Sequence, residues 1–144
     1  GRGAMSRTFA RRFQVATAGH DQMLDITPQV REVIQASGIR DGLVCVFVAH
    51  STAAVSVSEY EPGLVEDVRV AAERIAPERG SYAHNRLNAD DNAHSHLRSV
   101  VIGPSVTVPL VSGALTLGTW QRIVLIDFDT HARTRTVWVQ VLGE

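Results

Sequence analysis

The sequence has few of the features that support disulfide-stabilised or membrane-spanning folds. It contains a single cysteine, Cys45, so no disulfide can form within the chain and a reducing compartment is expected. No apolar run approaches the ~20 residues that a membrane-spanning helix requires. Residues 1–5 lack the apolar core of a signal peptide and are typical of an expression remnant. These absences predict a cytoplasmic protein with one domain over residues 6–144.

The chain also lacks an excess of charge of either sign. It has 14 basic and 15 acidic residues, and its formal net charge is -1. This balance predicts no general attraction to nucleic acids or to anionic membranes. Arginine is nevertheless clustered at Arg11–Arg12 and at Arg133–Arg135, which leaves room for a local anion-binding site.

Apolar residues at helical spacing predict three helices. The first covers residues 25–35 and starts beside Pro28. The second opens at Pro62 and ends before Pro77, and the third begins near Asn92. Proline is tolerated in the first turn of a helix and disrupts its interior, so these prolines mark helix ends.

Strands are predicted where apolar residues alternate with polar ones or form short β-branched runs. The predicted strands are 9–15, 43–49, 52–59, 106–110, 114–117, 121–128 and 134–142. The breaks at Ser112–Gly113 and at 130–132 predict turns between antiparallel neighbours. Strands exceed helices and do not alternate regularly with them. The expected fold is therefore α+β, with mainly antiparallel sheets packed like a sandwich and two or three helices.

A long polar stretch, residues 81–103, carries three of the six histidines and few apolar residues in its first half. A segment without its own core must be held by the rest of the fold, and such loops commonly carry function. Together with His50, at the end of a predicted strand, His84 and His96 would suit zinc or a similar divalent ion. His94 is not expected to join them, because on a helix it diverges from His96. The spacing of these histidines matches no named zinc motif, so the residues alone do not decide whether a metal binds.

Two pairs of charged residues add to the candidates. Asp90 and Asp91 could hold magnesium, act as a base, or cap the helix that begins near Asn92. Arg133 and Arg135 lie two residues apart near a strand start and would point to the same side. Paired guanidinium groups bind phosphate or carboxylate well, and a surface salt bridge is the plainer alternative.

Three segments of the chain resemble the YjbQ family of small bacterial and archaeal proteins, often labelled thiamine-phosphate-synthase-like. They read HSTAAVSVSEYEPGLVEDV, YAHNRLNADDNAHSHLRSVVIGPSVTVPL and GALTLGTWQRIVLIDFD, and the likeness extends from Phe9 to Glu144. The resemblance implies a compact α+β fold rich in antiparallel strands, assembled as a homotrimer.

The resemblance also implies a site and an activity. It implies His50, His84 and His96 as metal ligands, Glu59, Asp91, Gln121 and Arg135 as catalytic residues, and Thr52, Thr119 and Arg133 as anion-binding residues. The implied activity is a weak thiamine phosphate synthase reaction on small phosphate or diphosphate substrates, with a divalent metal, zinc in preference to magnesium. Hydroxymethylpyrimidine diphosphate would lose pyrophosphate, and the thiazole phosphate nitrogen would capture the pyrimidine carbon. A zinc-dependent hydrolase of an unknown small substrate and a non-catalytic metal-binding or anion-binding protein remain as alternatives.

Overall fold

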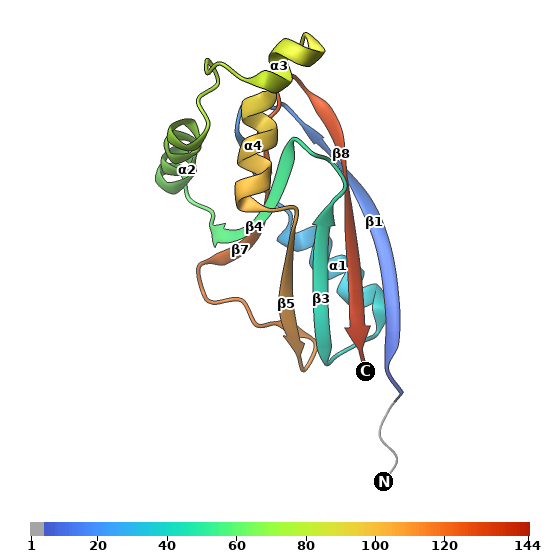
Figure 1. Ribbon diagram of the computed structural model, residues 1–144. Helices are drawn as coiled ribbons and strands as arrows, with labels where there is room; N and C mark the ends of the chain where they lie inside the picture. The colour runs from blue at the N-terminus through green and yellow to red at the C-terminus, as the bar shows by residue number, and fades with distance from the viewer. Residues whose placement is uncertain (1–4) are drawn as a thin grey trace.

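The computed structural model describes residues 5–144, in which two antiparallel sheets pack with four helices (Figure 1). The larger sheet has the strand order β1-β8-β3-β5-β6, and the smaller has the order β2-β7-β4. The strands are β1 (Arg7–Thr17), β2 (Gln22–Asp25), β3 (Gly42–Val48), β4 (Ala53–Glu59), β5 (Ser105–Val111), β6 (Ala114–Leu115), β7 (Gln121–Asp127) and β8 (Arg133–Gly143). The helices are α1 (Thr27–Ser37), α2 (Pro62–Ile75), α3 (Ala83–Asn88) and α4 (Ala93–Ile102).

The main core lies between the two sheets and α1. In β3, Val44, Val46 and Val48 face this core, and the intervening side chains face away from it. The smaller sheet is covered on both faces, because Leu125 of β7 packs in the main core and Val124 packs in a second core with α2. This difference explains why β3 alternates in burial and why β7 is a continuous apolar run.

The α+β class with antiparallel sheets is confirmed, and all seven predicted strands and three predicted helices are present. Two short elements were not predicted from the sequence. One is β2, which has only four residues and no clear alternation. The other is α3, a six-residue helix with no buried residue, which forms inside the polar stretch. Elements this short offer too few apolar positions for a periodic pattern to be recognised.

The prediction that a turn at 130–132 joins antiparallel neighbours is wrong. β7 belongs to the smaller sheet and β8 to the larger one, so this segment crosses between sheets. β7 pairs with β2 and β4, whereas β8 pairs with β1 and β3. The other predicted turn, at Ser112–Gly113, does join the antiparallel neighbours β5 and β6. The local sequence of a turn does not show which strands its two neighbours pair with, because that pairing is nonlocal.

Of the expected expression remnant, residues 1–5, only Met5 falls within the described part of the chain. Among the helices of residues 5–144, none combines the length and the apolar character needed to cross a membrane.

Candidate functional site

A polar cavity of about 330 Å³ lies where the two sheets and α4 meet. Its walls are the segment between β3 and β4 (Ala49 to Thr52), two residues at the start of α4 (Asn92 and His96), and three residues around the β7–β8 crossing (Asp129, Arg133 and Arg135). Five of the ten residues that the resemblance assigned to a site line this cavity: His50, Thr52, His96, Arg133 and Arg135.

The floor of the cavity is a buried ion pair between Arg135 and Asp127. Nε of Arg135 lies 2.7 Å from Oδ2 of Asp127, and Nη2 lies 2.8 Å from Oδ1. Asp127 also accepts hydrogen bonds from the Thr17 hydroxyl and from the Asp129 amide. Burial acts to raise the pKa of Asp127, but these hydrogen bonds and the Arg135 charge outweigh it and lower the pKa. The pair is therefore fully ionised and fixed in one geometry.

Thr52 connects this floor to a second carboxylate, Asp129. Nη2 of Arg135 donates to the Thr52 hydroxyl at 2.8 Å, and that hydroxyl donates to Oδ2 of Asp129 at 2.9 Å. Burial acts to raise the pKa of Asp129, but hydrogen bonds from the Thr130 amide, Thr52 and Arg133 bring it to about 2. Asp129 is thus an anion at neutral pH, and its oxygens are already engaged.

Arg133 is the cation at the mouth of the cavity. Its Nε lies 2.6 Å from Oδ2 of Asp129, and its side chain remains 39% exposed. Its terminal nitrogens, Nη1 and Nη2, make no hydrogen bond to any residue in 5–144. The expectation that Arg133 and Arg135 share a side holds, but their roles differ. The guanidinium of Arg135 donates to Asp127 and Thr52. The terminal nitrogens of Arg133 remain available to donate to a bound anion.

His50 presents one ring nitrogen to the protein backbone. Its Nε2 accepts a hydrogen bond of 2.9 Å from the Thr136 amide, which places the proton of the neutral ring on Nδ1. Burial and the neighbouring Arg135 lower the pKa of His50. His50 is therefore neutral at pH 7, with no free lone pair on either nitrogen.

The rings of His84 and His96 lie next to each other. Their ring centroids are 4.7 Å apart at an interplanar angle of 60°. Nε2 of His84 lies 3.2 Å from Oδ1 of Asn92 and 3.8 Å from Oδ2 of Asp90. Burial, with His84 next in effect, lowers the pKa of His96, while a hydrogen bond to the Ser51 backbone opposes the shift. His96 is thus a neutral ring at the cavity wall.

These donors do not fit a three-histidine metal site within one chain. No cluster of three or more His, Cys, Asp or Glu side chains within residues 5–144 has a geometry that could hold a metal ion. The physical reason is specific to His50, whose Nε2 lone pair is taken by the Thr136 amide. Nε2 of His84 faces the oxygens of Asn92 and Asp90, which favours a proton on that nitrogen.

Asp91 lies at the rim, connected to the cavity through Thr130. The Thr130 hydroxyl is 3.2 Å from Oδ1 of Asp91, and the Thr130 amide donates to Asp129. Asp91 is exposed and has no cationic partner within residues 5–144. Asp91 therefore lies beside the cavity without lining it, and it differs from Asp129 in having no arginine partner in the described part of the chain.

The remaining assigned residues, Glu59, Thr119 and Gln121, lie elsewhere. Glu59 pairs with Gln121 at the far end of β4 and β7, while the cavity lies at the Thr52 end. Seven strand residues separate the two ends by about 20 Å at 3.3 Å per residue. Oε1 of Gln121 also accepts from the Gly118 amide at 2.8 Å, which closes its own turn. Within one chain these three residues do not belong to the cavity.

Asp127 and Asp129, which hold the two arginines in place, were not among the site residues expected from the sequence. Their position in the sequence could have indicated this role, because both aspartates occur at the end of an apolar run. Residues 123–128 are all buried, yet the two aspartates recur two residues apart at the end of this strand. Two arginines recur with the same spacing at the start of the next strand. Buried charges are retained when they are paired, so this matched spacing predicts ion pairs.

A profile of the family described as UPF0047 protein YjbQ-like matches residues 11–144. A UPF0047 protein of Methanothermobacter thermautotrophicus is 38% identical over 142 residues, which cover 99% of this chain and 97% of that protein. YugU, a UPF0047 protein of Bacillus subtilis, is 31% identical over 132 residues, covering 90% and 96%. The crystal structure of a YbjQ-like protein from Sulfolobus solfataricus P2 is 37% identical, with a TM-score of 0.92, and the match covers 97% of this chain and 100% of that one. The chain therefore belongs to the YjbQ (UPF0047) family.

Proposed function

We propose that the cavity binds the phosphate or diphosphate group of a small organic substrate. The observation that carries this proposal is Arg133, whose Nε is fixed by Asp129 while both terminal nitrogens face no protein acceptor in residues 5–144. A guanidinium held in this way presents parallel donors to a phosphate oxygen pair. The neutral ring of His50 can add a donor through its protonated Nδ1.

We further propose that the reaction is a weak transfer of the thiamine phosphate synthase type. In that reaction the bond between carbon and the diphosphate oxygen breaks, and diphosphate leaves with the electron pair. The thiazole phosphate nitrogen then gives its lone pair to the same carbon. Arg133 would meet the charge that develops on the departing diphosphate, and the Arg135–Asp127 pair would keep Thr52 and Asp129 in position.

The test is a direct assay for thiamine phosphate from hydroxymethylpyrimidine diphosphate and thiazole phosphate at high protein concentration. We expect product with the wild-type chain and at least about tenfold less with Arg133→Gln, because a charge-assisted contact to the leaving group is lost. Arg69→Gln is the matched control, since Arg69 is exposed and pairs with Glu66 on the surface of α2. Absence of product with the wild-type chain would eliminate the transferase.

A second candidate is a non-catalytic anion-binding protein. It is favoured by the state of the two buried carboxylates, Asp127 and Asp129, which are both ion-paired and leave no buried general base. An NMR titration with inorganic diphosphate separates the two candidates. Shifts of the His96 and His50 ring protons without product formation would favour binding alone. Unchanged ring protons at millimolar diphosphate would contradict both.

The expected divalent metal, zinc in preference to magnesium, enters no step of this proposal. Elemental analysis of the purified protein with no added metal tests it. One zinc per chain that disappears in His84→Ala would support the metal expectation and the hydrolase alternative. Retention of the ion in His84→Ala would contradict the ligand assignment.

We also propose a cytoplasmic homotrimer. The support is the outer face of the larger sheet, where large apolar side chains remain exposed in the single chain. Phe47 and Trp138 pair across β3 and β8 on this face, and Leu43 pairs there with Leu142. Exposed apolar area of this kind on a sheet commonly marks an interface between subunits.

A further inference from the structure

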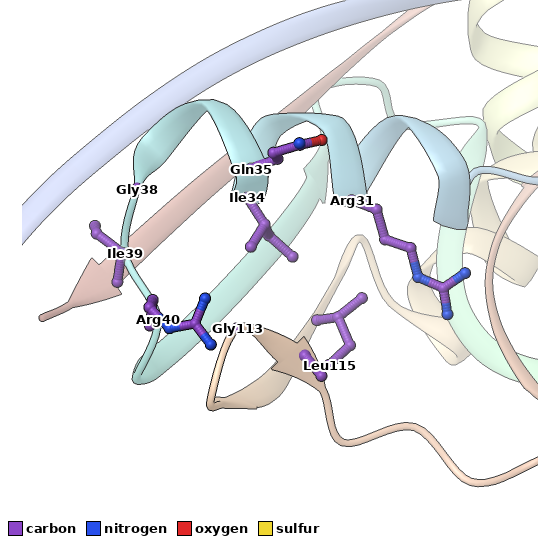
Figure 2. Close-up of a pocket in the computed structure, with 9 residues that line it drawn as sticks. Arg31, Ile34, Gln35, Gly38, Ile39, Arg40, Gly113 and Leu115 are labelled. Atoms are coloured by element: carbon purple, nitrogen blue, oxygen red, sulfur yellow. The ribbon is translucent and has the colours of Figure 1, made fainter.

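A second cavity, of about 460 Å³, lies between α1 and the turn that joins β5 to β6 (Figure 2). It shares no lining residue with the candidate site. Its volume falls within the range of about 300–1,000 Å³ that is typical of small-molecule sites. Two glycines line the cavity, Gly38 after α1 and Gly113 in the turn.

One part of this cavity is apolar. Ile34 and Ile39 are buried and form its inner wall, and Ala114 and Leu115 of β6 face them from the turn. Figure 2 shows the side chains of Ile34 and Leu115 in the space between the helix and the turn. Such a wall suits an alkyl or aryl group, because contact with it removes apolar surface from water.

Both ends of the cavity are cationic. Arg31 extends from α1, and Arg40 lies at the opposite end with its guanidinium group directed towards Gly113 (Figure 2). Nη2 of Arg40 donates to the Ser112 carbonyl at 2.9 Å. A Cβ on Gly113 would lie only 3.0 Å from Nη1 of Arg40, so this guanidinium occupies space that glycine leaves free. Arg40 is therefore held in place before any ligand arrives.

The positive charge of the cavity is not balanced by its own walls. No lining residue is acidic among those described. A third guanidinium, that of Arg7, approaches from β1, with Nη2 3.8 Å from where a Cβ on Gly38 would lie. The neighbouring carboxylate, Asp41, is engaged by the Ser112 amide at 3.0 Å. Charge complementarity thus calls for an anionic occupant.

We propose that this cavity binds an anionic amphiphile, a carboxylate or phosphate monoester on a small apolar body. The anionic group contacts the guanidinium of Arg31, whose donors match two oxygens of either group, and the positive charge of Arg40 at the opposite end adds to the attraction. The apolar body lies against Ile34 and Leu115. This proposal is independent of the candidate site, because the two cavities have separate walls and separate ligands.

The experiment is an amide NMR titration of the full chain with sodium octanoate and, in a second arm, octyl phosphate, below micelle-forming concentrations. We expect saturable shifts confined to residues 31–40 and 113–115, and the tighter of the two anions identifies the preferred headgroup. 1-Octanol lacks the anionic group and acetate lacks the alkyl chain. Each should bind at least about tenfold more weakly than octanoate.

Variants test the arginines directly. Arg31→Gln and Arg40→Gln should each weaken octanoate binding roughly three- to tenfold, the size expected for a partly exposed charged hydrogen bond. Arg69→Gln changes an arginine on α2 that is likewise exposed, and this variant should bind as the wild type does. Arg31 makes no side-chain hydrogen bond within residues 5–144, so Arg31→Gln serves if Arg40→Gln disturbs the turn. Absence of saturation with both anions, shifts located elsewhere, or wild-type binding by Arg31→Gln would each overturn the proposal.

Discussion

Arg135 is the largest side chain that the fold buries completely, and its neighbours explain how that burial is tolerated. Its guanidinium group meets both oxygens of Asp127 and the hydroxyl of Thr52. A buried charge is costly unless it is paired and hydrogen-bonded, and Arg135 satisfies both conditions. All 14 basic residues of the chain are arginines, whose planar donors suit such paired geometries.

Replacing Arg135 by methionine should strongly destabilise the chain. Arg135→Met leaves Asp127 buried without its counter-charge, and breaking a buried pair costs about 3–5 kcal/mol. Urea unfolding measures the loss. The double variant Arg135→Met with Asp127→Asn removes the orphaned charge and should recover part of the stability. A loss below about 1 kcal/mol in the single variant would contradict the role assigned to the pair.

The low pKa of Asp129 predicts a defined acid dependence. Its folded pKa of about 2 lies below the ordinary 3.8, so its contribution to stability is present above pH 3.8. That contribution, about 2 kcal/mol from the size of the shift, is lost as the pH falls from about 4 to about 2. A carbon NMR titration of the Asp129 carboxyl should have its midpoint near 2. The unfolding free energy of Asp129→Asn should lack this part of the acid dependence. A midpoint at or above 3.8 would count against the hydrogen-bond network.

At the scale of elements, the crossing from β7 to β8 is supported by the turn between β1 and β2. Gly19, His20 and Asp21 all have positive φ, at 75°, 54° and 68°. The His20 amide donates to the Asp129 carbonyl at 2.7 Å. Asp21 pairs with Arg98 of α4, which also pairs with Glu73 of α2. The strained turn thus connects the helices to the segment that carries Asp129.

Gly19→Ala should damage both stability and the candidate site. A Cβ at Gly19 would lie 2.7 Å from the carbonyl oxygens of Asp129 and His131, and the positive φ adds strain. We expect a loss of roughly 1–3 kcal/mol in urea unfolding. We also expect weaker diphosphate binding by NMR, because the Asp129–Arg133 segment must shift.

Gly103→Ala is the matched control for this prediction. Gly103 also has positive φ, at 101°, but nothing lies within 4 Å of its Cβ position. It should therefore show the conformational cost without the collision and should bind diphosphate as the wild type does. Equal effects of the two variants would mean that backbone strain, rather than contact with the crossing, explains the loss.

At the scale of the whole molecule, the two sheets differ in what covers them. The smaller sheet is buried on both faces, between the larger sheet and the helices. The larger sheet has its outer face open in the single chain, with Phe47, Trp138 and Leu142 exposed. This asymmetry is the physical basis for the proposed trimer, since association would cover the open face.

Trp138→Glu should prevent association without unfolding the chain. Trp138 is 39% exposed in the single chain, and its partners on this face are Phe47 across the sheet and the guanidinium of Arg12. Light scattering after size exclusion should give a trimer mass for the wild type and a monomer mass for Trp138→Glu. Ile75→Glu, an exposed apolar position on α2, is the control and should leave the mass unchanged. A trimer mass for Trp138→Glu would place the interface elsewhere.

The sequence alone determined the positions of the longer strands and helices, since these follow from local periodicity. The continuous apolar run of residues 43–49 and the prolines at helix starts are examples. The sequence also identified the polar stretch that contains His96. It identified Arg133 and Arg135, which line the cavity, as a pair. Such features depend on neighbours within a few residues, which the sequence presents directly.

Only the tertiary structure decided which of these residues meet. β7 and β8 lie in different sheets, and Glu59 and Gln121 lie away from the cavity. Nε2 of His50 accepts a hydrogen bond from a backbone amide. The tertiary structure also paired Arg135 with Asp127 and left Arg133 with free donors. Each outcome depends on contacts between segments far apart in the chain. Local periodicity sets which side of a strand a residue faces, but strand order and sheet packing set what it faces.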